Sequence, residues 1–160
     1  MNIIERIGTL FDIHQLVLDN FVFTFKKKQD EVFYPLQQRV RNPKSRLRSM
    51  GTDYLTYAIL DIIIEQNFVL IDSLDDVISE LEDQLLLCEQ SREIPITIQK
   101  LKREVISIRR DISPLRELIA GMLRSDSPLI NEKTHIYLRD VYDHSIRVIE
   151  SIESYREILT

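Results

Sequence analysis

The sequence predicts a mainly α fold within an α+β domain, in which long helices pack as antiparallel, coiled-coil-like elements. Only three glycines occur in 160 residues, although 44% of the residues are hydrophobic, and such a composition favours long helices over turn-rich sheets. Apolar residues recur at alternating steps of three and four in three stretches, at about 50–90, 95–125 and 130–160. One short segment near 21–26 alternates like a strand.

The first third of the chain contains short elements. Residues 2–19 place apolar side chains at helical spacing, and "FVFTF" (21–25) places Phe at alternate positions, as a strand does. A short helix is expected in "DEVFYPLQQRVR" (30–41), because Pro35 is tolerated in a first turn, where its missing N–H costs little. The segment "RNPKS" (41–45) then breaks that helix.

The rest of the chain carries the repeating apolar positions. The first run consists of Leu60, Ile64, Asn67, Ile71, Leu74, Ile78, Leu81 and Leu85. The second run consists of Ile98, Leu101, Val105, Ile108, Ile112, Leu115, Ile119 and Met122. The third run consists of Leu138, Val141, Ser145, Val148, Ile152, Tyr155 and Leu159. A period of about 3.5 residues over this length is typical of helices packed as coiled coils. The first two helices are expected to form a hairpin.

Charge is distributed unevenly over that hairpin. No Lys or Arg occurs between Arg48 and Arg92, where acids are frequent, whereas the second helix is rich in Lys and Arg. We expect charge to select the pairing and burial of Leu and Ile to stabilise it, because an exposed ion pair contributes only about 0–1 kcal/mol. The net charge of −5 argues against nucleic acid as a partner.

Two polar or helix-breaking positions lie inside the repeats. Pro114 either kinks the second helix or ends it, and the unbroken apolar spacing on both sides favours a kink. Asn67 occupies a position in the apolar seam of the first helix. It either sets the register of the helices at some cost in stability or is a partly exposed polar residue where the seam loosens.

The segment "YLRDVYDH" (137–144) concentrates ionisable side chains in the third helix. Asp140 and His144 are four residues apart and share one helix face, with Asp143 close by. From spacing alone the more common interpretation is a solvated surface. Zinc needs more nitrogen or sulfur ligands than this segment offers, whereas a carboxylate site suits Mg²⁺, which takes oxygen ligands and keeps several waters.

Several functional classes lack their motifs. No Gly-rich phosphate loop, HExxH or Ser/His/Asp arrangement occurs, so nothing indicates an enzyme. Cys88 is the only cysteine, which excludes an internal disulfide and suits a reducing compartment. The longest apolar stretch, 54–71, is interrupted by Asp61, Glu65 and Asn67, so we expect no membrane span in it.

Several phrases, in order along nearly the whole chain, resemble the CorA magnesium and metal-ion transporters. The most specific is the one around Asp140, and the match of the second helix includes Pro114. The phrases are "FDIHQLVLD" (11–19), "KQDEVFYPLQQRVR" (28–41), "SRLRSMGTDYLTYAILDIIIEQNF" (45–68), "LKREVISIRRDISPLRELI" (101–119), "SPLI" (127–130) and "YLRDVYDHSIRVIESIESYREIL" (137–159).

This resemblance implies a function that the spacing alone does not. It implies that the chain is the cytoplasmic part of a transporter in the cell membrane. In that family the cytoplasmic parts form a homopentameric funnel, and divalent ions bound between neighbouring subunits hold the closed state. Its regulatory metal-binding carboxylates fall on Asp61, Asp140 and Asp19. The ion it implies is Mg²⁺, with Co²⁺, Ni²⁺ or Zn²⁺ as alternatives.

The chain also departs from the family pattern. The family has several strands between the phrase that ends at Asp19 and the strand matched by "FVFTF", but here Asn20 follows Asp19 directly. We therefore interpret 1–48 as a remnant of an α/β N-terminal domain and 49–160 as a long-helix region. The family continues into two membrane spans with a Gly-Met-Asn signature, which this sequence does not contain. The alternative is a soluble helical-hairpin adaptor, or a metal-binding regulator similar to PhoU, with no membrane part.

Overall fold

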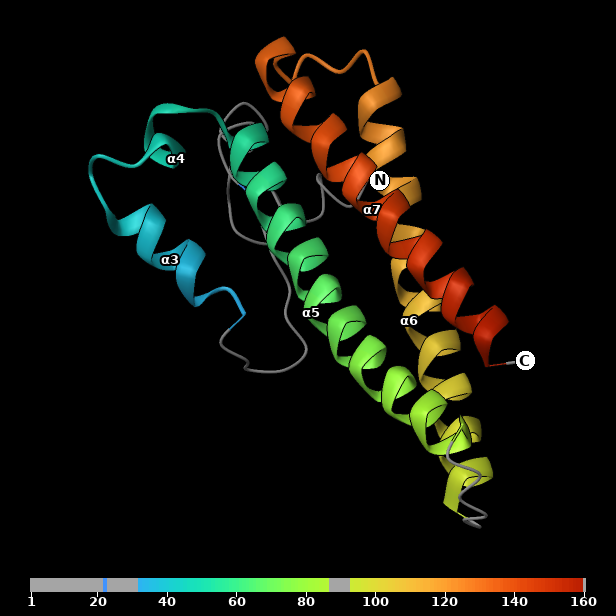
Figure 1. The fold of residues 1–160 in the computed structure, drawn as a ribbon. Coiled ribbons are helices and arrows are strands. Elements are labelled where there is room, and N and C mark those ends of the chain that lie inside the picture. Colours follow the sequence, from blue (N-terminus) through green and yellow to red (C-terminus); the bar gives the residue numbers. More distant parts are fainter. Residues whose placement is uncertain (1–21, 23–31, 87–92, 160) are drawn as a thin grey trace, which may run out of the picture. The chain divides into compact units, whose positions relative to one another are not determined.

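The computed structural model describes residue 22, residues 32–86 and residues 93–159 (Figure 1). Within these ranges every regular element is a helix, and the three long helices that the apolar repeats predict are confirmed. The helices are α3 (Tyr34–Arg41), α4 (Arg46–Ser49), α5 (Thr52–Leu86), α6 (Glu93–Arg124) and α7 (Glu132–Ile158).

The predicted strand and the α+β class are not supported. Val22 has no regular structure, and the other residues of 21–26 lie outside the described part of the chain, as does the helix expected at 2–19. No strand occurs in the part of the chain that is described. A strand needs a neighbouring strand to pair its backbone N–H and C=O groups, and the described residues supply none. The described fold is mainly α.

The chain divides into two compact units. Unit 1 holds the described residues up to Ile62 and those from Asp126 to Tyr137, and unit 2 holds those of Ile63–Ser125 and Leu138–Thr160. Helices α5 and α7 each begin in unit 1 and continue into unit 2. The domain boundary expected between 48 and 49 stays a prediction.

The short helices of unit 1 form where the sequence provides their ends. Pro35 lies in the first turn of α3, as expected, and the helix stops at Arg41. Ser45 caps α4, because its hydroxyl accepts a hydrogen bond from the N–H of Leu47 at 3.3 Å. The side chains of Leu36 and Leu47 are buried against the start of α5 and anchor both helices.

Three tyrosines form the aromatic part of the unit 1 core. The ring of Tyr54 lies edge-on to that of Tyr137 at 5.0 Å between centroids, and Tyr57 lies 5.2 Å from both. Arg46 of α4 donates a hydrogen bond to the hydroxyl of Tyr137 at 3.1 Å. Aromatic pairs at these distances contribute beyond their buried area, so this cluster fixes the start of α7 against the start of α5.

A second contact in unit 1 joins the first turns of the same two helices. One carboxylate oxygen of Asp53 accepts hydrogen bonds from the Thr134 hydroxyl at 2.6 Å and from the Asn131 N–H at 2.9 Å. The carboxylate approaches Gly51 so closely that a Cβ there would lie 2.6 Å from Asp53 Oδ1. Gly51 therefore leaves the space that this contact needs, and we call the contact the Asp53 clamp.

The core of unit 2 follows the predicted apolar repeats. Most repeat positions of this unit are buried, and in α7 even Ser145 is buried, with its hydroxyl donating to the Tyr142 carbonyl at 2.6 Å. The buried positions are Ile64, Ile71, Leu74, Ile78, Leu81, Leu101, Val105, Ile112, Ile119, Leu138, Val141, Ser145, Val148, Ile152 and Leu159. The clear exception is Leu85, which is 53% exposed near the end of α5.

Cross-helix contacts show how the helices of unit 2 are oriented. Phe68 packs edge-on against His144, and further along both helices the Tyr155 hydroxyl donates to Asp75 at 3.1 Å, so α5 and α7 run in the same direction. Helix α6 runs in the opposite direction to α5 (Figure 1), as the hairpin prediction requires. Partial burial, together with the Asp75 carboxylate, raises the pKa of Tyr155 to about 12.

The charge pairing expected between α5 and α6 is not found. Within the described ranges no ion pair joins these two helices, and the cross-helix pair of unit 2 is instead Arg109 of α6 with Glu153 of α7, at 2.6 Å. The acids of α5 beyond Asp61 occupy exposed positions outside the seam. Exposed pairs gain too little energy to hold long side chains in place, so burial alone accounts for the hairpin.

The two unusual seam positions have different outcomes. Helix α6 continues through Pro114 to Arg124, so the expectation that the helix does not end at the proline is confirmed. Half-buried Asn67 donates a hydrogen bond from Nδ2 to the carbonyl of Ile63 in its own helix at 2.6 Å. This contact agrees with the interpretation of Asn67 as a partly exposed polar residue, because its amide is used within one helix.

Helix α5 is long and apolar enough to cross a membrane, over Thr52–Leu85, when length and composition alone are considered. Asp61, Glu65 and Asn67 led us to expect no span, but they do not lower the mean hydropathy of α5 below the value that a span requires. A core helix of a soluble protein meets the same criterion, and α5 contributes buried side chains to both units. The criterion is therefore weak evidence for a span.

Candidate divalent-cation site

Asp140 is an exposed carboxylate on α7. Its side chain is 64% exposed, and it directly precedes the buried seam residue Val141. The imidazole of His144 lies beside it on the same helix face, with Nε2 3.7 Å from Asp140 Oδ1. The i, i+4 spacing that the sequence suggested is thus confirmed as a contact, while Asp143 is exposed at the neighbouring position.

Asp61 is a half-buried carboxylate on α5, in unit 1. It directly follows the buried seam residue Leu60 and accepts a hydrogen bond from the hydroxyl of Tyr57 at 3.3 Å. Tyr57 belongs to the aromatic cluster of unit 1, so this hydrogen bond holds Asp61 beside that cluster. We did not predict this partner from the sequence, although the four-residue spacing of Tyr57 and Asp61 on one helix could have indicated it.

The three predicted metal residues stay predictions. Asp61 belongs to unit 1, Asp140 belongs to unit 2, and Asp19 lies outside the described residues. Among the residues that are described, no group of three or more His, Cys, Asp or Glu side chains could hold a metal ion. Each carboxylate on its own offers oxygen ligands and leaves most of a coordination sphere to water, as Mg²⁺ tolerates.

The sequence as a whole identifies the family. The model of the CorA-like Mg²⁺ transporter protein family matches residues 3–160. The chain belongs to this family. The cobalt/magnesium transport protein CorA of Thermotoga maritima is 35% identical over 145 residues, which cover 91% of this chain and 41% of that protein. The putative metal ion transporter YfjQ of Bacillus subtilis is 24% identical over 147 residues, which cover 88% of this chain and 43% of that protein.

Solved structures show the same fold. The soluble domain of CorA from Methanocaldococcus jannaschii superimposes with a TM-score of 0.73 at 22% identity, over 82% of this chain and 53% of that one. The complete structure of the CorA magnesium transporter from the same organism gives a TM-score of 0.72 over 42% of its chain. This CorA-family chain therefore spans less than half of the length of the curated relatives that it matches.

Proposed function

We propose that this chain is the cytoplasmic divalent-cation-sensing and gating part of a CorA-like Mg²⁺ channel, and that the complete protein resides in the cell membrane. The observation that carries the proposal is the family match, which runs from residue 3 to residue 160. The names of the relatives, a cobalt/magnesium transport protein and a metal ion transporter, support a divalent cation as the cargo. We propose Mg²⁺ as the sensed ion, with Co²⁺, Ni²⁺ or Zn²⁺ as alternatives.

Sensing would use carboxylates that meet only between subunits. Asp61 and Asp140 each flank a buried seam residue instead of lying in the seam, so each can face a neighbouring copy. In a homopentamer, such carboxylates repel one another when no ion is bound, and a divalent cation relieves that repulsion. Asp19 is a third candidate ligand. Binding largely through water would give the weak affinity that sensing of millimolar Mg²⁺ requires.

The long helices provide a means of transmitting the effect of cation binding to the pore. Helix α7 carries Asp140 and is a single helix of 27 residues. We propose that the long-helix region, 49–160, acts as a lever on a pore formed by other residues of the complete transporter, while 1–48 is the remnant of an α/β domain. No chemical step on a substrate is part of this function, so we propose that the chain is not an enzyme.

The alternative is an adaptor or a PhoU-like metal-binding regulator without a membrane part. The weak membrane-span signal of α5 does not distinguish the two, because α5 is also a core helix. The coding sequence downstream of Thr160 does distinguish them. Two apolar spans and a Gly-Met-Asn signature support the channel, and a stop codon at that point supports the adaptor.

The gating role predicts a change in ion flux. In the complete transporter, reconstituted in vesicles, Mg²⁺ on the cytoplasmic side should close the wild-type pore. The double variant Asp61→Asn/Asp140→Asn should need several-fold more Mg²⁺ for the same closure, because amides neither repel one another nor attract the cation as carboxylates do. The measurement is Mg²⁺ influx against cytoplasmic Mg²⁺ concentration. Overlapping inhibition curves for wild type and variant would remove these two residues from gating.

A further inference from the structure

We propose that α6 presents a docking surface for the α5 helix of a second copy of this chain. The surface is the outward face of α6, which we call the basic face and which consists of Ile96, Gln99, Lys100, Arg103, Ile106 and Arg110. All six side chains are exposed and follow one another at helical spacing. They lie away from the side of α6 that buries Leu101, Val105 and Ile112 in the core of unit 2.

The basic face is hollowed at one end. A groove of about 530 Å³ is lined, among the described residues, by Pro95, Ile96, Gln99, Lys100 and Arg103. The groove therefore offers apolar surface from Pro95 and Ile96 together with two cations. Ile96 is 70% exposed and Ile106 is 58% exposed, so the face combines positive charge with aliphatic side chains that are not covered within the chain.

The matching surface is on α5 of the same chain. Its outward face, the acidic face, consists of Glu65, Val69, Asp72, Asp76, Glu80 and Asp83, again at steps of three or four. Five of these six residues are acids, all six are exposed, and no Lys or Arg occurs on α5. Val69, which is 58% exposed, supplies an aliphatic contact among the carboxylates. The two faces are thus opposite in charge and both partly apolar.

Neither face is satisfied within the chain. In the described ranges, no ion pair joins a residue of either face to another helix, and the one charge contact is between Arg110 and its neighbour Asp111, at 3.7 Å. The faces belong to the two halves of one hairpin and cannot cover each other. They can pair between copies, with the acidic face of one chain against the basic face of the next. Such head-to-tail contacts between unlike surfaces form rings when the rotation closes.

Charge reversal tests this docking. We expect the wild-type chain at high concentration and low ionic strength, in chelator, to self-associate in sedimentation experiments and to dissociate as salt screens the faces. Lys100→Glu/Arg103→Glu gives two acidic faces, and Asp72→Lys/Asp76→Lys/Glu80→Lys, which leaves Glu65 and Asp83 beside three lysines, gives two basic faces. Each variant alone should associate at least about tenfold more weakly than wild type, and an equimolar mixture of the two should recover association, because every contact is again between opposite charges.

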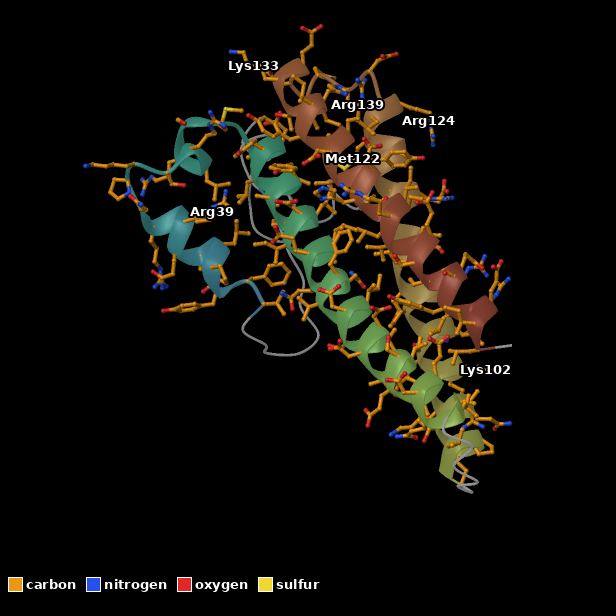
Figure 2. All side chains as sticks on the ribbon, viewed as in Figure 1. Arg39, Lys102, Met122, Arg124, Lys133 and Arg139 are labelled. Atoms are coloured by element: carbon orange, nitrogen blue, oxygen red, sulfur yellow. The ribbon has the colours of Figure 1, made fainter. Side chains whose placement is uncertain are left out.

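A matched control separates docking from net charge. Arg39→Glu/Arg41→Glu changes the charge of α3 by the same amount as the α6 variant, at exposed positions outside both faces (Figure 2 labels Arg39), and should associate like wild type. The chelator removes any contribution of divalent cations at Asp61 and Asp140, so the result is independent of the sensing proposal. A mixture that fails to recover association would overturn the docking. So would a wild-type chain that stays monomeric while its basic face binds vesicles of anionic phospholipid.

Discussion

Replacing Ile112 by alanine should lower the free energy of unfolding by about 2–5 kcal/mol, the range for an isoleucine truncated in a packed core. Ile112 is 1% exposed and lies in the α6 seam, in the middle of unit 2. The loss combines the transfer free energy of the deleted methylene and methyl groups with the cavity that the surrounding helices leave unfilled. Chemical denaturation followed by far-ultraviolet circular dichroism, which reports helix content, measures it.

The same helix provides the control. Ile106 is 58% exposed on the outward face of α6, so Ile106→Ala removes the same atoms without opening a cavity. Its effect should stay within about 0.5 kcal/mol, as for surface substitutions in general. Equal losses for the two variants would mean that the α6 seam has been assigned to the wrong face.

The second large effect is expected at the Asp53 clamp. Asp53→Ala removes the acceptor of two hydrogen bonds and leaves the hydroxyl of Thr134, a residue that is 0% exposed, without its partner. Hydrogen bonds to charged groups contribute about 1.5–3 kcal/mol each, and a buried unsatisfied donor adds a desolvation cost. We expect a loss of about 2–3 kcal/mol. Asp126→Ala, at an exposed position of the same unit, should change stability little.

The clamp also predicts a dependence on pH. Partial burial raises the pKa of Asp53, but hydrogen bonds from Thr134, Asn131 and Tyr54 outweigh it, and the pKa in the fold lies below its ordinary value. The carboxylate therefore stabilises the fold above the unfolded-state pKa of about 3.9, and this contribution is lost as pH falls through the lower folded pKa. The stability difference between wild type and Asp53→Ala should shrink below about pH 4. A difference that stays constant down to acid unfolding would contradict the ionised clamp.

The long helices were predictable because their information is local and periodic. Alternating steps of three and four located the buried seams of α5, α6 and α7, including Ser145, a polar residue that the pattern alone placed in the core. Where a helix end loosens, the same pattern overestimates burial, as at Leu85. A strand such as the one expected at 21–25 depends on a partner that is distant in sequence, so local alternation alone does not establish it.

Contacts between individual polar side chains were harder to predict than the buried seams. Spacing alone indicated the proximity of Asp140 and His144, since it follows from one helical turn. The Asp53 clamp joins residues about 80 positions apart, and nothing local in the sequence indicates it. Charge was misleading for the hairpin, because the acids of α5 and the cations of α6 suggested pairs that are absent among the described residues. Exposed charges do not determine how helices pack, whereas buried aliphatic side chains do.

The sensing role is tested most directly by titrating the chain with Mg²⁺ at constant ionic strength while its melting temperature and association are followed. A ligand that binds only the folded, assembled state stabilises it by about 2.7 kcal/mol at a hundredfold excess over its Kd. The wild-type chain should therefore melt at higher temperature or associate more strongly as Mg²⁺ rises. Asp61→Asn/Asp140→Asn should lose most of this response.

The control for this titration carries the same loss of charge elsewhere. Asp111→Asn/Asp126→Asn replaces two exposed acids, one in each unit, and should respond to Mg²⁺ like wild type. This comparison distinguishes bound cation from general screening of a chain with net charge −5. We expect a response in wild type and control that is weakened in Asp61→Asn/Asp140→Asn. The same response in all three proteins would contradict the sensing role and make Asp61 and Asp140 ordinary solvated surface residues.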